Sequence, residues 1–397
     1  MVFMSFDIIH RSRRNIAQGA ITNSKHPDRF VEGVPSHVKY GSGAYLIDMA
    51  DQKWLDMICG LGANHFGYGN QKIQKEILRF SFHGGCHSLP THHEVEAAEK
   101  LKELYPFVEK VKWVNDGSSA CTAALSIARA YTGRHVVLTE GYHGWHPEHI
   151  STVAYKPDGN AYRIYELEKD LSNVDENVAA VIVEPIQLDD SKERIEFLKK
   201  LRLACHANKV VLIFDEVITG LRYPKLGVSN SFGILPDLVL VGKAMGNGEK
   251  IAAVCGQSDL MDGDYFCSGT YHGHIFSLIA AKTCMNFAKY DSKFDLKRLN
   301  EDSLIFYEKL NAMAKGLFRI EGWGCRGAFK GSYFLFLQEM VKAKILFGPS
   351  VFLNFENIKH IDEILHFSQI ALDKIHEGSV KLECQEPTGA FSSKART

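Results

Sequence analysis

Short apolar runs alternate with longer amphipathic stretches through the middle of the chain. Apolar runs of this length are typical of strands buried on both faces of a parallel sheet, and amphipathic stretches between them are typical of covering helices. The runs comprise residues 111–114, 136–139, 180–183, 210–214, 238–241 and 252–255. The pattern therefore predicts an α/β protein with a mostly parallel sheet.

Polar and small residues follow five of these runs, at the points where the predicted strands end. In an open parallel sheet, ligands bind beyond the carboxyl ends of the strands. We therefore expect one crevice to collect the residues that follow the runs, which are Asn115-Asp116-Gly117, Glu140-Gly141-Tyr142, Glu184-Pro185, Asp215-Glu216 and Gly242-Lys243.

The two ends of the chain show other patterns. Residues 43–56 are typical of two short strands joined by a polar turn. Towards the carboxyl end, helical periodicity appears at 303–317, a strand-like run at 332–337 and a further helical stretch at 361–375. Both ends are therefore expected to fold outside the parallel sheet.

The length of the chain also points to more than one core. At 397 residues it exceeds the roughly 250–300 residues that a single hydrophobic core usually serves. We predict an N-terminal segment of a small lobe over residues 1–60, a large cofactor-binding domain over 61–285, and a C-terminal small domain over 286–397 with a loose tail from about 383.

Composition and charge exclude several classes of protein. With 46 basic against 47 acidic residues, the net charge of −1 gives no global attraction to nucleic acid or an anionic membrane. No apolar run approaches the roughly 18 residues that span a bilayer, and the N-terminus lacks the pattern of a secretory signal. Nine cysteines without a Cys-x-x-Cys pair favour reduced thiols in a cytoplasmic protein.

A carboxylate and an amine follow neighbouring apolar runs. Asp215 follows the run at 210–214, and Lys243 follows the run at 238–241 after Gly242. Pyridoxal phosphate (PLP) needs a lysine to hold its aldehyde as a Schiff base and an acid to keep its pyridine nitrogen protonated, so that the ring acts as an electron sink. A pyridinium beside Asp215 should hold the pKa of that carboxyl low. Each residue alone is common in loops, and only the combination predicts this cofactor.

A phosphate cradle is predicted where the run at 111–114 meets a helical stretch. Gly117, Ser118 and Ser119 precede this stretch, whose free backbone N–H groups and positive dipole end would attract a phosphate. Either serine taken alone would more commonly cap the helix. The proximity of Asp215 and Lys243 in the predicted sheet favours the phosphate.

Two side chains are candidates to enclose the cofactor ring. Tyr142 could lie on one face, while Val217, two residues past Asp215, packs on the other. His143, His146 and His149 offer a competing metal site. Pro147 interrupts any helix that would align these histidines, and no acidic or thiol ligand is spaced to complete the set, so no metal is predicted.

Taken together, the motifs resemble those of the class III PLP-dependent aminotransferases, most closely the branch that contains glutamate-1-semialdehyde aminomutase. The similarity runs from about Gly43 to about Ile375. Its markers are Gly43-Ala44-Tyr45-Leu46-Ile47-Asp48, Asn115-Asp116-Gly117-Ser118, Tyr142-His143-Gly144, Val183-Glu184-Pro185, Asp215-Glu216-Val217-Ile218-Thr219-Gly220, Gly242-Lys243, Ser268-Gly269-Thr270 and Phe347-Gly348-Pro349-Ser350.

The resemblance implies a fold-type I homodimer with active sites at the subunit interface, in which a large domain with a mostly parallel sheet joins a smaller α+β domain built from both chain ends. Lys243 would be the Schiff-base lysine and Asp215 the partner of the pyridine nitrogen. The other roles it implies are phosphate binding by Gly117 and Ser118, stacking by Tyr142, contact of Thr270 with the phosphate of the neighbouring subunit's cofactor, and a place for Glu184 on the substrate side of the ring.

Departures from the aminomutase pattern concern the substrate. Only residues 151–165 stand where the aminomutase has a long glycine-rich loop, which indicates a missing lid. Gly60-Leu61 replaces a typical Ser-Trp pair, and Phe352-Leu353 stands where an acidic residue is typical. Arg29 is the candidate for binding a substrate carboxylate, because a guanidinium suits a bidentate contact, although a surface arginine is the commoner interpretation.

The sequence thus predicts an enzyme that moves an amino group from an amine or amino-acid donor to a carbonyl acceptor through Lys243. Three alternatives stay open: a PLP-dependent decarboxylase or lyase, a 2,1-aminomutase of the glutamate-1-semialdehyde type, and a non-catalytic scaffold on the same fold.

Overall fold

The computed structural model describes residues 2–150, 162–383 and 386–387, and it divides into two units. The smaller unit comprises Met1–Leu61, His65–Asn70 and Leu299–Thr397, and the larger comprises Gly62–Asn64 and Gln71–Arg298. Most of the predicted loose tail, and most of the loop predicted to lack a lid, lie outside the described residues. Within them, every helix is too short or too polar to cross a membrane.

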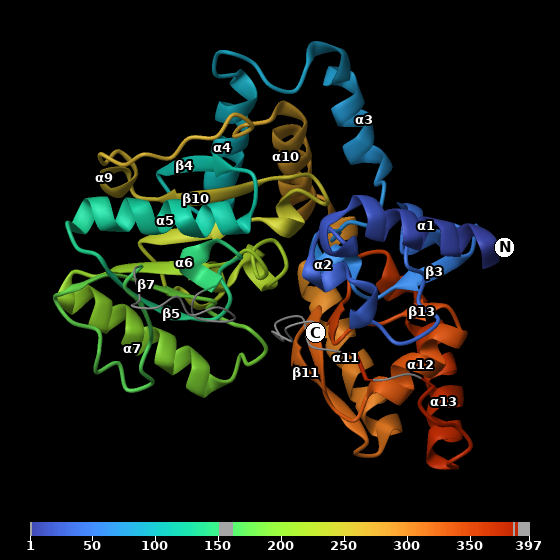
Figure 1. Ribbon diagram of the computed structural model, residues 1–397. Helices are drawn as coiled ribbons and strands as arrows, with labels where there is room; N and C mark the ends of the chain where they lie inside the picture. Colours follow the sequence, from blue (N-terminus) through green and yellow to red (C-terminus); the bar gives the residue numbers. More distant parts are fainter. Residues whose placement is uncertain (1, 151–161, 384–385, 388–397) are drawn as a thin grey trace. The chain divides into compact units, whose positions relative to one another are not determined.

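A seven-stranded sheet with the order β4-β10-β9-β8-β7-β5-β6 forms the centre of the larger unit (Figure 1). All six predicted strands are confirmed, whereas β6 was missed because its three residues carry only one buried side chain. The strands are β4 (Lys110–Val114), β5 (Val136–Glu140), β6 (Ile164–Glu166), β7 (Val178–Val183), β8 (Val211–Asp215), β9 (Leu238–Val241) and β10 (Ala252–Gly256).

Strand direction brings the polar ends together. Strands β6, β5, β7, β8 and β9 pair in parallel, while β10 is antiparallel to both β9 and β4. Because two antiparallel pairings restore the direction, β4 ends at the same edge of the sheet as β8 and β9. The segment that follows β4 therefore lies at the edge where Asp215 ends β8.

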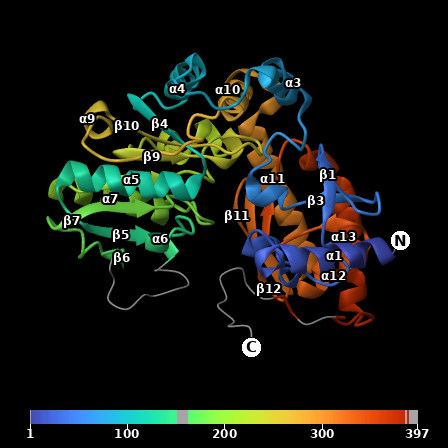
Figure 2. The same cartoon turned by 45° about the horizontal axis from the view of Figure 1, so that its top comes forward.

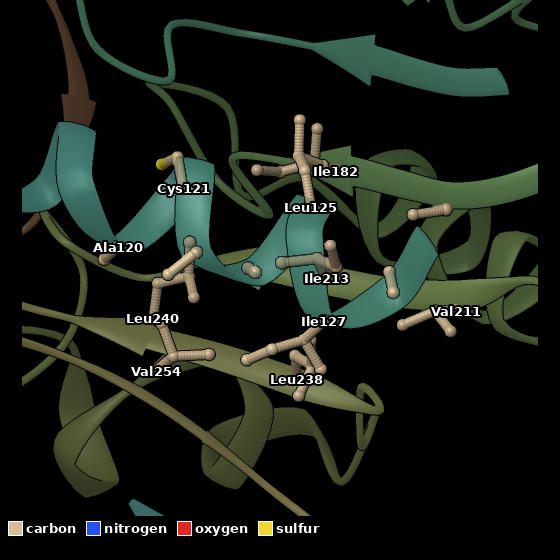
Figure 3. Packing of buried hydrophobic residues seen from close by; sticks show 14 of the residues in the cluster. Ala120, Cys121, Leu125, Ile127, Ile182, Val211, Ile213, Leu238, Leu240 and Val254 are labelled. Carbon is tan, nitrogen blue, oxygen red and sulfur yellow. The ribbon is translucent and has the colours of Figure 1, made fainter. Parts of the chain in front are cut away.

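Helices cover both faces of this sheet. Helix α5 packs on one face through Leu125 and Ile127, which meet alternate strand residues such as Ile213 and Leu240 (Figure 3). Helix α7 packs against β8, and α10 packs against both α3 and α4, with α4 next to β4 (Figure 2). These helices are α3 (Gln71–Phe80), α4 (His92–Leu104), α5 (Gly117–Thr132), α6 (Pro147–Ile150), α7 (Lys192–Asn208), α8 (Val228–Phe232), α9 (Ser258–Met261) and α10 (Ile275–Tyr290).

The smaller unit joins the two ends of the chain in one sheet, with the order β1-β2-β3-β13. The predicted pair of strands at 43–56 is confirmed as β2 and β3, and β13 pairs in parallel with β3. A second sheet has the order β11-β12-β14. The strands are β1 (Val38–Ser42), β2 (Tyr45–Asp48), β3 (Lys53–Asp56), β11 (Phe318–Trp323), β12 (Arg326–Gly331), β13 (Ile345–Leu346) and β14 (Ser350–Phe352).

The strand predicted at 332–337 is wrong, because this segment enters a helix, α12 (Phe334–Lys342). Its buried residues Phe336, Leu337, Met340 and Val341 recur at helical spacing, and a short apolar run alone does not distinguish a strand from a buried helix. The two predicted helices at 303–317 and 361–375 are confirmed as α11 (Leu296–Ala314) and α13 (Ile361–His376). The other α-helices in the described part of the chain are α1 (Val2–Asn15) and α2 (Cys59–Gly62).

The burial of Leu240 in the core of the large sheet leads to a prediction about stability. Leu240 is fully buried on β9 beneath α5. Replacing it with alanine should lower the free energy of unfolding by about 3 kcal/mol, because a cavity adds to the lost apolar burial. Urea denaturation measures the change. The matched control is Leu203→Ala on α7, where the side chain is 70% exposed and the loss should stay below about 0.5 kcal/mol. Equal losses in both variants would contradict the packing described.

Candidate active site

Asp215 and Lys243 lie at the ends of neighbouring parallel strands. Asp215 is the last residue of β8, and Lys243 follows β9 after Gly242 and opens the 3₁₀ turn Lys243–Met245. This predicted placement is confirmed, while the roles of the two residues stay predictions. Lys243 has a φ of 42°, a left-handed conformation that costs free energy in a residue with a side chain and often occurs at functional sites.

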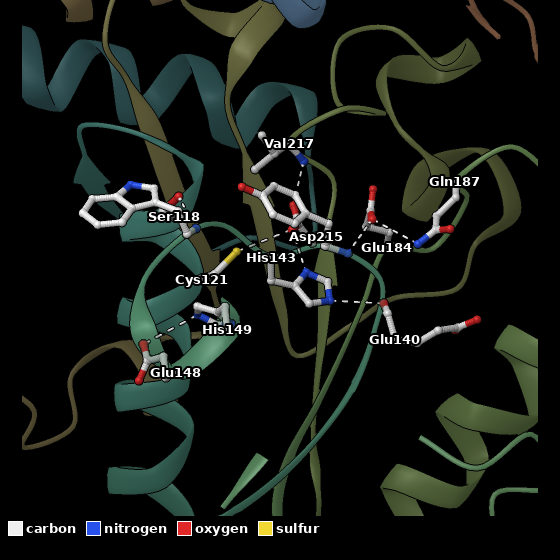
Figure 4. Close-up of polar contacts among 12 residues, drawn as sticks. Ser118, Cys121, Glu140, His143, Glu148, His149, Glu184, Gln187, Asp215 and Val217 are labelled. Atoms are coloured by element: carbon white, nitrogen blue, oxygen red, sulfur yellow. Dashed lines mark hydrogen bonds and ion pairs between the residues drawn. The ribbon is translucent and has the colours of Figure 1, made fainter. Parts of the chain in front are cut away.

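The Asp215 carboxylate is 7% exposed and accepts hydrogen bonds on both oxygens (Figure 4). Oδ2 lies 2.8 Å from His143 Nδ1 and 3.4 Å from Cys121 Sγ, and Oδ1 accepts the Val217 N–H at 3.1 Å. Burial raises the pKa of Asp215, but the bond and charge of His143, the Val217 amide and the charge of Lys243 outweigh it. The pKa therefore falls below its ordinary value, and Asp215 is ionised.

His143 contacts a second acceptor, since its Nε2 lies 3.1 Å from the carbonyl oxygen of Glu140 at the end of β5. Burial lowers the pKa of His143, yet the Asp215 hydrogen bond and charge raise it more, so the net shift is upward. Sequence reasoning missed this histidine and Cys121 as neighbours of Asp215. Their positions depend on the sheet order β8-β7-β5 and on the seat of α5, which no local pattern encodes.

Glu184, which follows β7, ties the loop after β5 to the same edge. Its Oε1 accepts the backbone N–H of Tyr142 at 2.8 Å and the Gln187 side-chain amide at 3.1 Å. Burial and then the charge of Asp215 raise the pKa of Glu184. Tyr142 is 39% exposed, and partial burial raises its pKa, with the negative charges of Glu184 and Asp215 adding to the shift.

The start of α5 presents N–H groups to this edge. Asp116 caps the helix by accepting the Ser119 N–H at 2.8 Å, so neither Ser118 nor Ser119 is the cap. The Ser118 hydroxyl accepts the Trp145 N–H at 3.3 Å. Gly144 has a φ of 105° and lies so close to Ser118 that a Cβ there would overlap it. The loop after β5 is thus folded onto the helix start.

These residues fit the predicted cofactor. A Cβ on Gly117 would lie 3.1 Å from Val217 Cγ1, so the helix start and the apolar side chain expected against the ring are in contact distance. An ionised acid, an amine just past the end of the next strand, and the N-terminus of a 16-residue helix are the groups that a pyridine ring, an aldehyde and a phosphate require.

The other two predicted residues, Thr270 and Arg29, have contacts of their own. Thr270 is exposed in the segment between α9 and α10, where its carbonyl oxygen accepts the Cys86 thiol at 3.0 Å. Arg29 belongs to the smaller unit and donates from Nη2 to Asn23 Oδ1 at 2.7 Å. The part of either residue in binding stays a prediction.

Among the residues that the structure describes, His143, His146 and His149 are not brought together as one set of possible metal ligands. His146 Nδ1 lies 2.8 Å from Thr122 Oγ1, and burial first and then the charge of His143 lower the pKa of His149 to about 3. Cys121, His143 and Asp215 do lie close together, which the sequence spacing did not anticipate. However, the 2.8 Å between Nδ1 and Oδ2 is a hydrogen-bond length, shorter than the roughly 3.3 Å between two ligands of a tetrahedral zinc ion.

Comparisons with known proteins find chains that this one resembles. The family model described as aminotransferase class-III matches residues 29–158 and 147–332. The glutamate-1-semialdehyde 2,1-aminomutase of Desulfotalea psychrophila is 32% identical over 323 residues, which cover 72% of each chain. The aminomutase of Haloquadratum walsbyi is 32% identical over 302 residues, 69% of this chain and 68% of that protein.

Two solved structures share the fold. The FumI protein of Sphingopyxis sp., in its PLP internal aldimine form, has a TM-score of 0.88 at 21% identity over 96% of this chain and 98% of that chain. An omega-transaminase from Sphaerobacter thermophilus has a TM-score of 0.82 at 22% identity over 94% and 98%. The predicted fold class, a fold-type I arrangement with a large, mostly parallel sheet, is confirmed.

In the protein without cofactor, the ion pair between Asp215 and His143 should contribute to the free energy of unfolding only within a limited range of pH. The lowered pKa of Asp215 means that its contribution is present above about pH 4 and is lost as the pH falls through the folded value. The raised pKa of His143 means that its contribution is complete below about pH 6.5 and is lost as the pH rises through the folded value.

A double-mutant cycle with Asp215→Asn and His143→Asn, measured by urea denaturation, should therefore give a coupling of about 2 kcal/mol near pH 5.5. The coupling should shrink at acid pH and at alkaline pH. A coupling that is constant from about pH 3 to about pH 10 would contradict the ionised pair.

Proposed function

The chain belongs to the class III aminotransferase family, and from this we propose that it transfers an amino group from an amine or amino-acid donor to a carbonyl acceptor, with Lys243 as the catalytic lysine. The cofactor of this PLP-dependent enzyme supplies an electron sink for the pair of electrons left on a substrate carbon when its proton is removed. The observation that carries the proposal is the buried, ionised Asp215 at the end of β8, next to the strand β9 that Lys243 follows.

The binding roles follow from the chemistry of each group. Asp215 would hold a protonated pyridine nitrogen as its counter-ion, and the start of α5, with Gly117, Ser118 and Ser119, would bind the phosphate. Tyr142 and Val217 would enclose the ring and exclude water from its faces. Glu184 would border the substrate side, where its raised pKa allows the carboxyl to donate a hydrogen bond.

Lys243 would act twice. Its amine would hold the cofactor through the aldehyde. Once the donor amine has bound in its place, Nζ would take up the proton that leaves the substrate carbon and return it, as general base and then general acid. Arg29 is proposed to bind a substrate carboxylate through its guanidinium.

A 2,1-aminomutase is the second candidate, because the relatives at 32% identity carry that name. The replacement of a Ser-Trp pair by Gly60-Leu61 and of an acidic residue near Phe352-Leu353 weighs against the aminomutase substrate. The two activities differ in stoichiometry, because an aminomutase needs no separate acceptor. A decarboxylase would instead release carbon dioxide without any acceptor.

We further propose a homodimer, in which a second copy covers an apolar surface of the larger unit. Phe82 and Phe266 are 95% and 89% exposed, and Leu89 and Tyr271 are exposed nearby in sequence. The two segments adjoin, since Gly85 accepts the Ile275 N–H at 2.9 Å. A monomer rarely exposes so many large apolar side chains together. Thr270 lies within this surface, as a residue that reaches a partner's phosphate would need to.

A cytoplasmic location is also proposed. Among the described residues, the eight cysteines are free thiols and six of them are buried, which suits a reducing compartment.

Removal of the Lys243 amine tests the catalytic proposal. Lys243→Ala should lower turnover at least roughly 10³-fold and abolish the absorption band at roughly 410–430 nm that a lysine-bound cofactor gives. In the wild type, one donor amine should convert this band to one near roughly 330 nm without release of carbon dioxide. Lys250→Ala, an exposed lysine on the loop after Lys243, is the matched control. Retention of the band by the Lys243 variant would exclude the proposed role.

Charge placed in the apolar surface tests the dimer. Phe82→Asp combined with Phe266→Asp should shift the sedimentation coefficient from dimer to monomer and reduce activity at least roughly tenfold, because burying an unpaired carboxylate at an interface costs several kcal/mol. Leu203→Asp on α7 controls for a charge at another exposed apolar residue. A monomeric wild type, or a monomeric variant with full activity, would rule out the shared site.

A further inference from the structure

His143 lies between two groups that can only accept hydrogen bonds. The ring is 3% exposed, with Nδ1 2.8 Å from the Asp215 carboxylate and Nε2 3.1 Å from the carbonyl oxygen of Glu140. A carbonyl oxygen has no proton to give, and neither has an ionised carboxylate. Both ring nitrogens must therefore donate, and a ring with N–H at both positions is an imidazolium. His143 is held as a buried cation.

Five neighbouring groups determine the electrostatic surroundings of the His143 cation. Asp215 approaches from β8, Cys121 from α5, Glu184 from the end of β7, and His149 from α6 at a ring-centroid distance of 6.2 Å. Lys243 contributes a second positive charge from the end of β9.

Of these neighbours, Asp215 alone is a contacting anion among the described residues. Burial raises the pKa of the Cys121 thiol well above its ordinary value, so the thiol stays neutral. Burial raises the pKa of Glu184 and lowers that of His149, which favours the neutral form of each. The imidazolium thus acts mainly on the Asp215 carboxylate.

Fold stability alone does not explain the number of hydrogen-bond donors around the Asp215 carboxylate. A buried ion pair seldom stabilises a fold more than apolar residues of the same size would, because both charges lose their hydration. Cys121 adds a weak S–H donor to the same oxygen at 3.4 Å. The arrangement makes chemical sense if the carboxylate must resist taking up a proton, since each donor and each nearby positive charge favours the ionised form.

We propose that His143 is a positioning residue whose positive charge keeps the ring proton on the cofactor's pyridine nitrogen rather than on Asp215, with Cys121 as a secondary donor on the same oxygen. The inference rests on the proposed pairing of Asp215 with that nitrogen. Two cations that share one carboxylate are each closer to it than to each other, so the attraction of His143 for ionised Asp215 exceeds its repulsion of the pyridinium. Loss of the charge should move the proton towards Asp215 and weaken the electron sink.

The protonation state of His143 can be measured in the protein without cofactor. In ¹⁵N-histidine-labelled protein, both ring nitrogens of His143 should be protonated from about pH 5 to about pH 8. The signal is assigned by its absence in His143→Asn and in His143→Gln. An unprotonated nitrogen on His143 at neutral pH would overturn the inference.

The kinetics of a neutral variant distinguish a role of the His143 charge from a role of the His143 shape. The side-chain amide of the variant His143→Asn would keep a neutral donor near the position of Nδ1, so a role in shape alone predicts little change. We expect kcat to fall at least tenfold, and the primary isotope effect with α-deuterated donor to increase, because removal of the substrate proton becomes slower. Cys121→Ala should show a smaller loss than His143→Asn, because the thiol is the weaker donor and carries no charge.

The outcomes distinguish this inference from the function it rests on. If Asp215→Asn retains wild-type activity, the proposed role of Asp215 fails and the inference fails with it. If Asp215→Asn is inactive while His143→Asn keeps the wild-type rate and isotope effect, the inference about His143 fails and the proposed function stands.

Discussion

The organising constraint of the larger unit is the burial of a charged carboxylate at the end of β8. An ionised acid removed from water must regain the hydrogen bonds that it loses, or it takes up a proton. Asp215 meets this requirement with groups from three separate places, namely His143 after β5, Cys121 on α5 and the backbone of Val217. The loop after β5 and the start of α5 can each be displaced only by removing a donor from that carboxylate.

Glu216, which directly follows Asp215, is also a buried acid but has a different role. Glu216 is fully buried and accepts bonds from the Thr219 hydroxyl, the Val228 N–H, and both the N–H and hydroxyl of Ser229. Burial raises the pKa of Glu216 despite these donors. It anchors the segment between β8 and α8, while Asp215, one residue earlier, faces the histidine. Asp215 ends β8 and Glu216 begins the segment that follows it, and the two acids have different hydrogen-bond partners.

The sequence was informative where local pattern determines structure. Continuous apolar runs located the strands of the large sheet, since both of its faces are covered, and the acid and amine at neighbouring strand ends followed from the same pattern. The sequence was uninformative about contacts that depend on the order of strands in the sheet. Nothing near His143 in sequence indicates that its ring meets Asp215, and the cap of α5 is Asp116 rather than either serine. The run at 332–337 was misassigned because its length suits both a strand and a helix turn.

The pairing of β3 with β13 bears on how the protein is made. The larger unit, apart from Gly62–Asn64, is continuous from Gln71 to Arg298, so its residues leave the ribosome in one uninterrupted stretch. The strands β1 to β3 emerge first, yet the partner of β3 is encoded near residue 345. Throughout synthesis of the larger unit, one edge of β3 offers unpaired N–H and C=O groups to any other nascent strand. Chaperone dependence during translation should therefore concentrate on the amino-terminal segment rather than on the residues that bind the cofactor.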